Sequence, residues 1–147
     1  MGMFDAMEIS ASGLTAERLR MDVTAQNLAN AQTTRGADGQ PYRRKEVVLA
    51  ERQAERTFGA ALAGAMSPGA RPAGVEVAAI AEDPTPLKQV YDPSHPDADA
   101  NGYVQMPNVD TVAEMVDLIS AQRAYEANVT AMQAAKQMFA KTLELLR

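Results

Sequence analysis

The sequence has 147 residues, of which 46% are hydrophobic and 22% charged, and these values predict one folded domain rather than a disordered chain. The absence of cysteine excludes disulfides, cysteine-based zinc sites, thiolate nucleophiles and Fe–S clusters, and the single histidine, His95, excludes multi-histidine metal sites. The net charge is −5, and residues 75–147 hold eleven acidic against five basic side chains. The only basic run, Arg43 to Lys45, is diluted by nearby acidic residues, so we expect no nucleic-acid partner.

No segment approaches the roughly 20 consecutive apolar residues that a membrane-spanning helix needs. The first ten residues contain Asp5 and Glu8, no basic residue and no continuous apolar region, so they do not resemble a cleavable signal peptide. We therefore expect no membrane insertion, and we expect any export to follow a route that needs no cleaved signal.

The N-terminal segment predicts a helix, because proline is absent from Phe4 to Asn30. Apolar residues recur there at intervals of seven, namely Met7, Leu14, Met21 and Leu28. This spacing predicts a long amphipathic helix. We expect Asn30 to end it in the left-handed conformation, which asparagine tolerates better than most residues.

The middle of the chain, residues 32–108, contains all eight prolines. Its apolar runs are short and are β-branched or alternating, which predicts strands and turns. The expected strands are 42–49, 75–81 and 102–106. Residues 50–66 fit either an Ala-rich helix or part of a mobile loop, and we expect a variable loop near 54–74.

The C-terminal segment begins after Pro107. Thr111 and Glu114 have the spacing of a capping box, in which each side chain caps the other residue's backbone amide. Apolar residues then recur every seven positions, namely Leu118, Tyr125, Met132, Phe139 and Leu146, with a second row at Met115, Val129 and Leu143. This heptad pattern predicts a helix over about 110–146.

Helix length sets the expected architecture. The C-terminal helix would be about 55 Å long and the N-terminal one about 40 Å, whereas a compact domain of this size is roughly 40 Å across. We therefore predict an α+β fold in which the terminal helices pair as an antiparallel, coiled-coil-like hairpin, closed at one end by a small β-rich middle domain. The expected divisions are an N-terminal axial helix, a β-rich middle region and a C-terminal axial helix, at 1–31, 32–108 and 109–147.

Both expected helices are rich in small residues. Gly13 inside a helix costs about 1 kcal/mol relative to alanine, so we expect it at a close helix contact. Because alanine-rich seams bury little area, we expect a partly disordered monomer that orders on assembly. On the second helix, Arg123 and Glu126 fit a surface ion pair, and Asn128 fits either a surface position or a residue that fixes register.

Residues 97–102, Asp-Ala-Asp-Ala-Asn-Gly, match the first half of an EF-hand calcium loop. Position twelve of that loop is Asn108 instead of glutamate, so an Asx-rich turn is the preferred interpretation. A calcium-binding module at Asp97, Asp99 and Asn101 is the alternative. No phosphate-binding loop, oxyanion site or general base accompanies these acidic residues, so we expect no enzymatic activity, no cofactor and no small-molecule substrate.

Two segments resemble signatures of the bacterial flagellar axial proteins. Residues 12–18 (SGLTAER) and 21–31 (MDVTAQNLANA) are similar to the N-terminal signature of the rod proteins, and residues 123–128 (RAYEAN) to one shared by rod and hook proteins. In the middle, residues 39–48 and 95–110 resemble the proximal-rod members. The chain is thus identified as a member of the bacterial flagellar basal-body rod protein family, with another rod or hook-type axial subunit as the alternative.

The resemblance implies a structural subunit of the proximal rod, exported by the flagellar type III secretion apparatus without a cleaved signal. Such subunits polymerise in the periplasm into the hollow drive shaft that transmits torque. Their terminal helices form a coiled-coil layer around the export channel, and the β-rich middle lies further out. The implied partners are other copies, other rod proteins, the rod base adaptor, the MS-ring region and the export apparatus.

On this reading, most residues of interest lie at assembly interfaces along the two helices. They are Met7, Gly13, Leu14, Met21, Asn27, Leu28, Asn30, Leu118, Arg123, Tyr125, Glu126, Asn128, Met132 and Phe139. A basic region and an acidic region of adjacent subunits are also expected to meet, through Arg43, Arg44, Asp97 and Asp99.

Overall fold

The computed structural model describes residues 3–36, 38–52 and 74–145. Two long helices lie at the ends of this chain, α1 (Met3–Ala29) and α3 (Thr111–Leu145). Between them are two antiparallel strand pairs, β1 (Lys45–Glu51) with β2 (Val75–Glu82), and β3 (Lys88–Tyr91) with β4 (Tyr103–Met106). The predicted α+β class with two terminal helices is confirmed.

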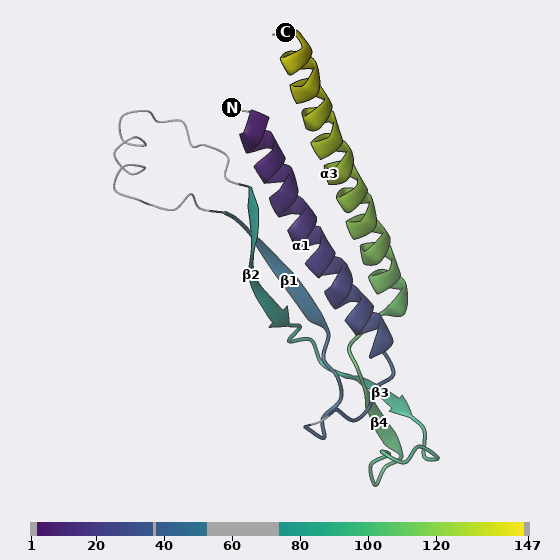
Figure 1. Cartoon of the computed structure of the whole chain (residues 1–147). Helices are drawn as coiled ribbons and strands as arrows, with labels where there is room; N and C mark the ends of the chain where they lie inside the picture. The colour runs from purple at the N-terminus through teal and green to yellow at the C-terminus, as the bar shows by residue number, and fades with distance from the viewer. Residues whose placement is uncertain (1–2, 37, 53–73, 146–147) are drawn as a thin grey trace, which may run out of the picture.

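The two helices lie side by side and run antiparallel, so both chain ends lie at the same end of the molecule (Figure 1). Gly13 lies against Asn128, and further along the pair Asn27 bonds to Glu114. In this register the start of α1 is level with about residue 138, because both helices rise about 1.5 Å per residue. The last two turns of α3 therefore project beyond α1. Coiled-coil packing between the helices stays a prediction.

The N-terminal cap of α3 differs from the expected one. Asp110 Oδ1 accepts hydrogen bonds from the amides of Val112 (3.0 Å) and Ala113 (3.4 Å). The predicted capping box of Thr111 and Glu114 is wrong, because the Asp110 carboxylate already satisfies these free amides. The Glu114 amide bonds to the Asp110 carbonyl instead, and the Glu114 carboxylate points toward α1.

Asn30 ends α1 through its side chain and not through a left-handed conformation. Only glycines among the described residues have positive φ, so that prediction is wrong. The Asn30 amide group donates to the Gln26 carbonyl (2.9 Å), and its side-chain oxygen accepts a hydrogen bond from the Thr33 hydroxyl (3.1 Å). These bonds satisfy polar groups at the helix end without the change of backbone conformation that we expected.

The β1–β2 hairpin lies along α1 (Figure 1). Its register runs from Lys45 opposite Glu82 to Glu51 opposite Val75. The Ser12 hydroxyl of α1 accepts a hydrogen bond from the Val75 amide (3.1 Å) and so fixes the hairpin to the helix. The strands expected at 42–49 and 75–81 are confirmed, with the first beginning three residues later.

Residues 50–66 were ambiguous in the sequence, and the first two of them, Ala50 and Glu51, belong to β1. The expected variable loop near 54–74 lies outside the described residues except for Gly74, which has a φ of 92°. The division of the chain into three regions at 31 and 108 stays a prediction.

The β3–β4 pair lies at the base of the helices, away from the two chain ends (Figure 1). Tyr91 is opposite Tyr103, and their rings pack edge to face with centroids 5.3 Å apart. The strand expected at 102–106 is confirmed as β4, but β3 was missed. It has only four residues, Lys-Gln-Val-Tyr, which is too short for an alternating pattern to be recognised.

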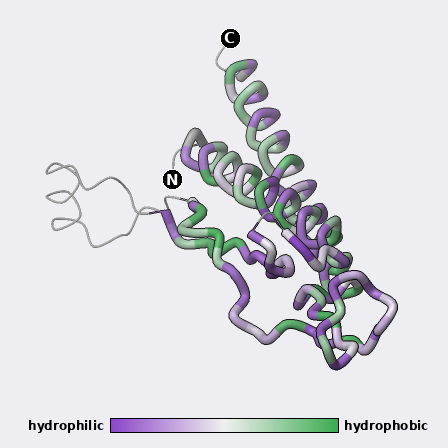
Figure 2. Tube along the Cα trace, turned by 90° about the horizontal axis from the view of Figure 1, so that it is seen from below, coloured by the Kyte–Doolittle hydropathy of each residue, from purple (hydrophilic) through white to green (hydrophobic). Residues whose placement is uncertain are grey.

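The buried core is small. Among the described residues it contains the apolar side chains of Ala16, Val23, Val104, Val109, Ala121 and Ala135 and the polar residues Thr24, Asn27 and Glu114. Figure 2 shows hydrophobic and hydrophilic residues interspersed along both helices, and several large apolar residues of α3 are exposed. The low aromatic content of the sequence, 5%, agrees with such a core.

Candidate assembly surfaces

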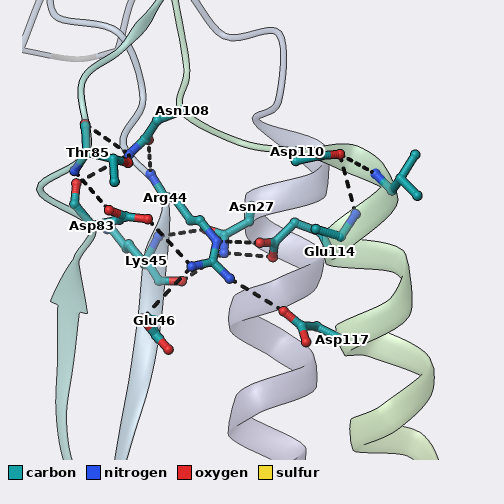
Figure 3. Close-up of polar contacts among 12 residues, drawn as sticks. Asn27, Arg44, Lys45, Glu46, Asp83, Thr85, Asn108, Asp110, Glu114 and Asp117 are labelled. Carbon is teal, nitrogen blue, oxygen red and sulfur yellow. Dashed lines mark hydrogen bonds and ion pairs between the residues drawn. The ribbon is translucent and has the colours of Figure 1, made fainter.

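Asn27 is buried at the base of the helix pair, with 1% of its surface exposed. Its side-chain oxygen accepts hydrogen bonds from the Tyr42 hydroxyl and the Lys45 amide, both at 2.9 Å. Its amide nitrogen donates to the Lys45 carbonyl (2.8 Å) and to Glu114 Oε2 (3.0 Å). All four hydrogen-bonding positions of this side chain are therefore used, and they connect α1, the start of β1 and α3 (Figure 3).

Arg44 is the positive centre of the same cluster. Its Nε donates to Glu114 Oε1 at 2.6 Å, and its two terminal nitrogens lie 3.4 Å from Asp117 and 3.6 Å from Asp83 (Figure 3). The hydrogen bond to Glu114 raises the pKa of Arg44, so its charge is permanent. Glu114 is 1% exposed, and a buried carboxylate needs such partners to remain stable in the fold.

Asn108 extends the cluster to the segments that connect the strands. Its Oδ1 accepts a hydrogen bond from the Arg44 amide (2.8 Å), and its Nδ2 donates to the Thr85 hydroxyl (2.8 Å). We call Asn27, Arg44, Asn108 and Glu114 the base junction. Its hydrogen bonds fix how the two helices and the strands meet. The sequence singled out Asn27 and Arg44 for assembly, but it gave no indication that Glu114 is their shared partner.

The seam between the helices consists of small residues. A Cβ atom on Gly13 would lie 3.0 Å from the Asn128 amide nitrogen, so only glycine fits there without displacement. Ala16 on α1 and Ala121 and Ala135 on α3 are buried. The close contact expected at Gly13 is present, and Asn128 lies in it with its amide bonded to the Ala124 carbonyl (3.0 Å).

The larger apolar residues expected at assembly interfaces flank this seam. Those that are half-buried are Met7, Leu14, Met21, Leu28, Leu118, Tyr125 and Met132. Phe139, near the C-terminal end, is 37% exposed. Asn30 is half-buried at the end of α1, where it makes the bonds described above. The structure thus places these residues within the chain, and their contacts with other subunits stay a prediction.

Arg123 and Glu126 are both exposed on α3. Glu126 accepts a hydrogen bond from Gln122 at 3.1 Å. Within the described residues no ion pair joins Arg123 to Glu126, so the expected surface pair is absent there. The Arg123 side chain remains at the surface.

Three of the four charged residues expected between subunits, Arg44, Asp97 and Asp99, have partners inside the chain. Arg44 belongs to the base junction, and Arg43 is half-buried. Asp97 accepts a hydrogen bond from the Thr34 hydroxyl at 2.9 Å. Asp99 accepts hydrogen bonds from two backbone amides of its own turn, at 2.8 and 2.9 Å. The expected Asx turn is therefore present, and in the described part of the chain no three acidic or histidine side chains gather as metal ligands.

One apolar surface was not recognised in the sequence. Four residues at the start of α3 are strongly exposed, namely Val112 (68%), Met115 (49%), Val116 (61%) and Ile119 (52%). Their spacing of three, four and seven residues was the available signal. The seven-residue row that starts at Leu118 is the stronger pattern, because it continues over five positions.

Comparison with known proteins identifies the family. Residues 7–37 match the family "Flagella basal body rod protein", and residues 100–145 match "Flagellar basal body rod FlgEFG protein C-terminal". The flagellar basal-body rod protein FlgC of Bacillus subtilis strain 168 is 51% identical over 99% of both chains. The FlgC of Borreliella burgdorferi is 44% identical over 100% of this chain and 99% of the relative. The chain belongs to the FlgC family of flagellar basal-body rod proteins.

The FlgC of Salmonella typhimurium is also similar, with 45% identity over 99% of this chain and 98% of the relative. The resemblance noted in the sequence is thereby confirmed. The chain is a structural subunit of the proximal rod of the flagellar basal body, and it is not an enzyme. None of the described helices is both long and apolar enough to cross a bilayer.

Proposed function

We propose that the chain polymerises through α1 and α3 into the hollow proximal rod, which transmits torque and surrounds the export channel. One observation carries this proposal. The seam between the helices uses small and polar residues, whereas the larger apolar side chains of both helices remain partly exposed. Such side chains contribute about 25 cal/mol per Å² when a neighbouring subunit removes them from water.

The proposed lateral face consists of two rows of larger apolar residues, one on each helix, that flank the seam between α1 and α3. Leu14 is two residues, about 200° of helix rotation, from Ser12, and Ser12 bonds to β2. The row of Met7, Leu14, Met21 and Leu28 therefore faces away from the β1–β2 hairpin. On α3, Leu118, Tyr125 and Met132 complete the face. Coiled-coil packing with neighbouring helices would cover it, with the β-rich middle further from the channel.

The proposed partners are other copies of the chain, other rod proteins, the rod base adaptor, the MS-ring region and the export apparatus. The proposed location is the rod where it spans the periplasm, reached through the type III apparatus without a cleaved signal. The contact between the basic and acidic regions of adjacent subunits is part of the proposal. Arg43 tests it best, because Arg44 and Asp97 are bonded within the chain. Unchanged assembly and salt dependence in Arg43→Glu would contradict that contact.

The lateral face is tested by placing charges on it. In a bacterium whose own copy of the gene is deleted, a chain carrying Tyr125→Lys and Met132→Lys should be made and exported but should not restore motility. Gln133→Lys with Gln137→Lys is the matched control, because both glutamines are exposed on the same helix. Full motility of the first variant would refute the lateral face. Circular dichroism of the purified variants shows whether α3 still forms.

A further inference from the structure

The lower half of β2 has an uncovered edge. The Asp83 amide, just after this strand, donates to the Arg44 carbonyl at 2.8 Å. Because backbone groups of an antiparallel strand alternate in direction, Asp83 and Ala81 direct theirs toward β1, whereas Ile80 and Glu82 direct theirs outward. In the described part of the chain no other element bonds to these outward groups, and both side chains are exposed, that of Ile80 by 49%.

Helix α1 covers other parts of the hairpin edges. At the base, the amide and the carbonyl of Lys45 in β1 both bond to Asn27. At the opposite end of the hairpin, the Val75 amide of β2 bonds to Ser12. These contacts leave the β2 edge at residues 80–82 open to solvent.

A second free edge belongs to β3. The Asp92 amide donates to the Gly102 carbonyl at 2.9 Å, so Val90, two residues earlier, directs its backbone groups toward β4. Gln89 and Tyr91 direct theirs outward, where no other described element bonds to them. All four residues of β3 are exposed, including Val90 (42%) and Tyr91 (65%). In Figure 1, β2 lies to the left of β1, whereas β3 lies to the right, below the helices.

The two free edges are complementary in length and in sequence. When they are aligned antiparallel so that the outward backbone groups meet, the opposing residues are Ile80 with Tyr91, Ala81 with Val90, Glu82 with Gln89, and Asp83 with Lys88. This alignment contains an aromatic residue opposite a β-branched one and a pair of opposite charges, both of which stabilise neighbouring strands. Pro84, Pro86 and Pro93 flank the two segments and limit the pairing to about this length.

We propose that β3 of one subunit adds as an antiparallel strand to the β2 edge of a second copy of this chain. The same chain does not make this pairing, because its β3 and β2 belong to separate sheets. The Asn108 amide group holds the segment between them by donating to the Asp83 carbonyl (3.3 Å) and to the Thr85 hydroxyl (2.8 Å). Both edges therefore stay available to neighbouring subunits.

The strand contact adds to the packing of the terminal helices and does not replace it. It involves only the β-rich middle, which lies outside the helix pair. It joins two different surfaces, so each copy keeps one free edge of each kind for the next copy. The inference rests on the proposed function, and it specifies how the middle regions of neighbouring subunits meet.

Disulfide formation tests the contact, because the chain has no cysteine of its own. In the proposed alignment Ala81 and Val90 form a pair whose Cβ atoms are about 4.5–5.5 Å apart, close to the separation that a disulfide needs. The full chain carrying Ala81→Cys and Val90→Cys is produced in the bacterium that lacks its own copy, and isolated basal bodies are oxidised with copper phenanthroline. We expect dimers and larger species on a non-reducing gel, and we expect reduction to remove them.

The matched control shifts one cysteine by a single position. In Glu82→Cys with Val90→Cys, the two side chains point to opposite faces of the proposed sheet, because successive residues of a strand alternate. This variant should remain monomeric under the same oxidation. Each single cysteine variant should also remain monomeric.

The remaining outcomes separate this inference from the proposed function. Basal bodies of a motile strain that contain the chain but give no cross-linked species would overturn the strand contact and leave the rod assignment intact. Three other results also overturn it, namely dimers from one single variant, a disulfide within one chain, and a cross-link to a different rod protein. Absence of the chain from wild-type basal bodies would instead refute the proposed function.

A second test removes one outward N–H group without adding a cysteine. Gln89→Pro deletes an amide that points away from β4, so the isolated chain should keep its fold, as checked by urea unfolding. The yield of intact basal bodies should fall. Gln89→Ala is the matched control, because it keeps the amide and should give the wild-type yield. Equal yields from the two variants would contradict the strand contact.

Discussion

The two ends of the helix pair are stabilised in different ways. At the base, Asn27, Arg44 and Glu114 form a buried junction in which hydrogen bonds connect both helices to β1. At the other end, residues 138–145 of α3 extend past α1 with their side chains exposed up to residue 144. The base junction is complete within one chain, whereas the side chains of this projecting end are exposed to residue 144 in the isolated chain. The difference suggests that the chain itself fixes the angle and register of its helices, while assembly stabilises their tips.

The largest effect is expected at the base junction. Glu114→Ala should lower the free energy of unfolding by about 3 kcal/mol, because it leaves the Arg44 Nε–H and one Asn27 donor without the buried carboxylate that accepts from both. Urea unfolding of the purified chain measures this. Glu126→Ala, at an exposed position of the same helix, is the control and should change the free energy by less than about 0.5 kcal/mol. Equal effects of the two variants would contradict a stabilising base junction.

A smaller loss is expected in the seam between the two ends. Gly13→Val places a side chain against Asn128, where a Cβ would already be only 3.0 Å from the amide nitrogen. We expect a loss of about 1–3 kcal/mol from overpacking, again measured with urea. Adding Asn128→Ala should recover part of this loss, because it removes the obstructing amide. Simple additivity of the two substitutions would show that Gly13 is not held close to Asn128.

At the projecting end, stability and assembly should respond differently. Leu143→Ala should change the free energy of unfolding of the isolated chain by less than about 0.5 kcal/mol, because this leucine is 53% exposed. The same variant should reduce the yield of intact basal bodies. Val23→Ala is the control for the stability measurement. Val23 is buried in α1, so this substitution should destabilise the isolated chain measurably. A large stability loss from Leu143→Ala would mean that the tip is covered within the monomer.

The smallest effect is expected on the pH dependence of the free energy of unfolding. Hydrogen bonds from the backbone and side chain of Thr85 hold the pKa of Asp83 below its ordinary value of 3.8. A lowered carboxyl pKa stabilises the fold above the ordinary value, and that stabilisation is lost as pH falls through the lowered pKa. Asp83→Asn should therefore reduce the difference between urea midpoints at pH 7 and pH 3, and the exposed Asp38→Asn should not. Identical pH dependence of both variants would contradict this role.

Local patterns predicted the elements well but not the contacts between them. The proline-free N-terminal segment and the apolar heptads after Pro107 correctly indicated two long helices, and the short runs at 75–81 and 102–106 indicated strands. The pairing of Arg44 with Glu114 spans 70 residues, and nothing in either local sequence selects that partner among several acidic residues. The capping-box pattern pointed Glu114 toward its own helix end, where Asp110 was the better cap.

The heptad rows show a related limit. They located apolar residues on the right helices, but the most buried row of α3 contains Glu114, Ala121 and Ala135, which are small or polar. Small residues are buried where helices approach closely, so hydrophobicity alone does not identify the seam. The exposed group of Val112, Met115, Val116 and Ile119 was missed for the converse reason, because these apolar side chains face water in the isolated chain.

Hydrogen exchange compares the two ends most directly. In the isolated chain, backbone amides of α3 between 115 and 128 should exchange slowly, because the base junction and the seam hold that part of the helix against α1. Amides at 138–145 should exchange fast in the isolated chain and slowly in assembled basal bodies. Slow exchange at 138–145 in the isolated chain, or fast exchange there after assembly, would contradict a tip that is stabilised by neighbouring subunits.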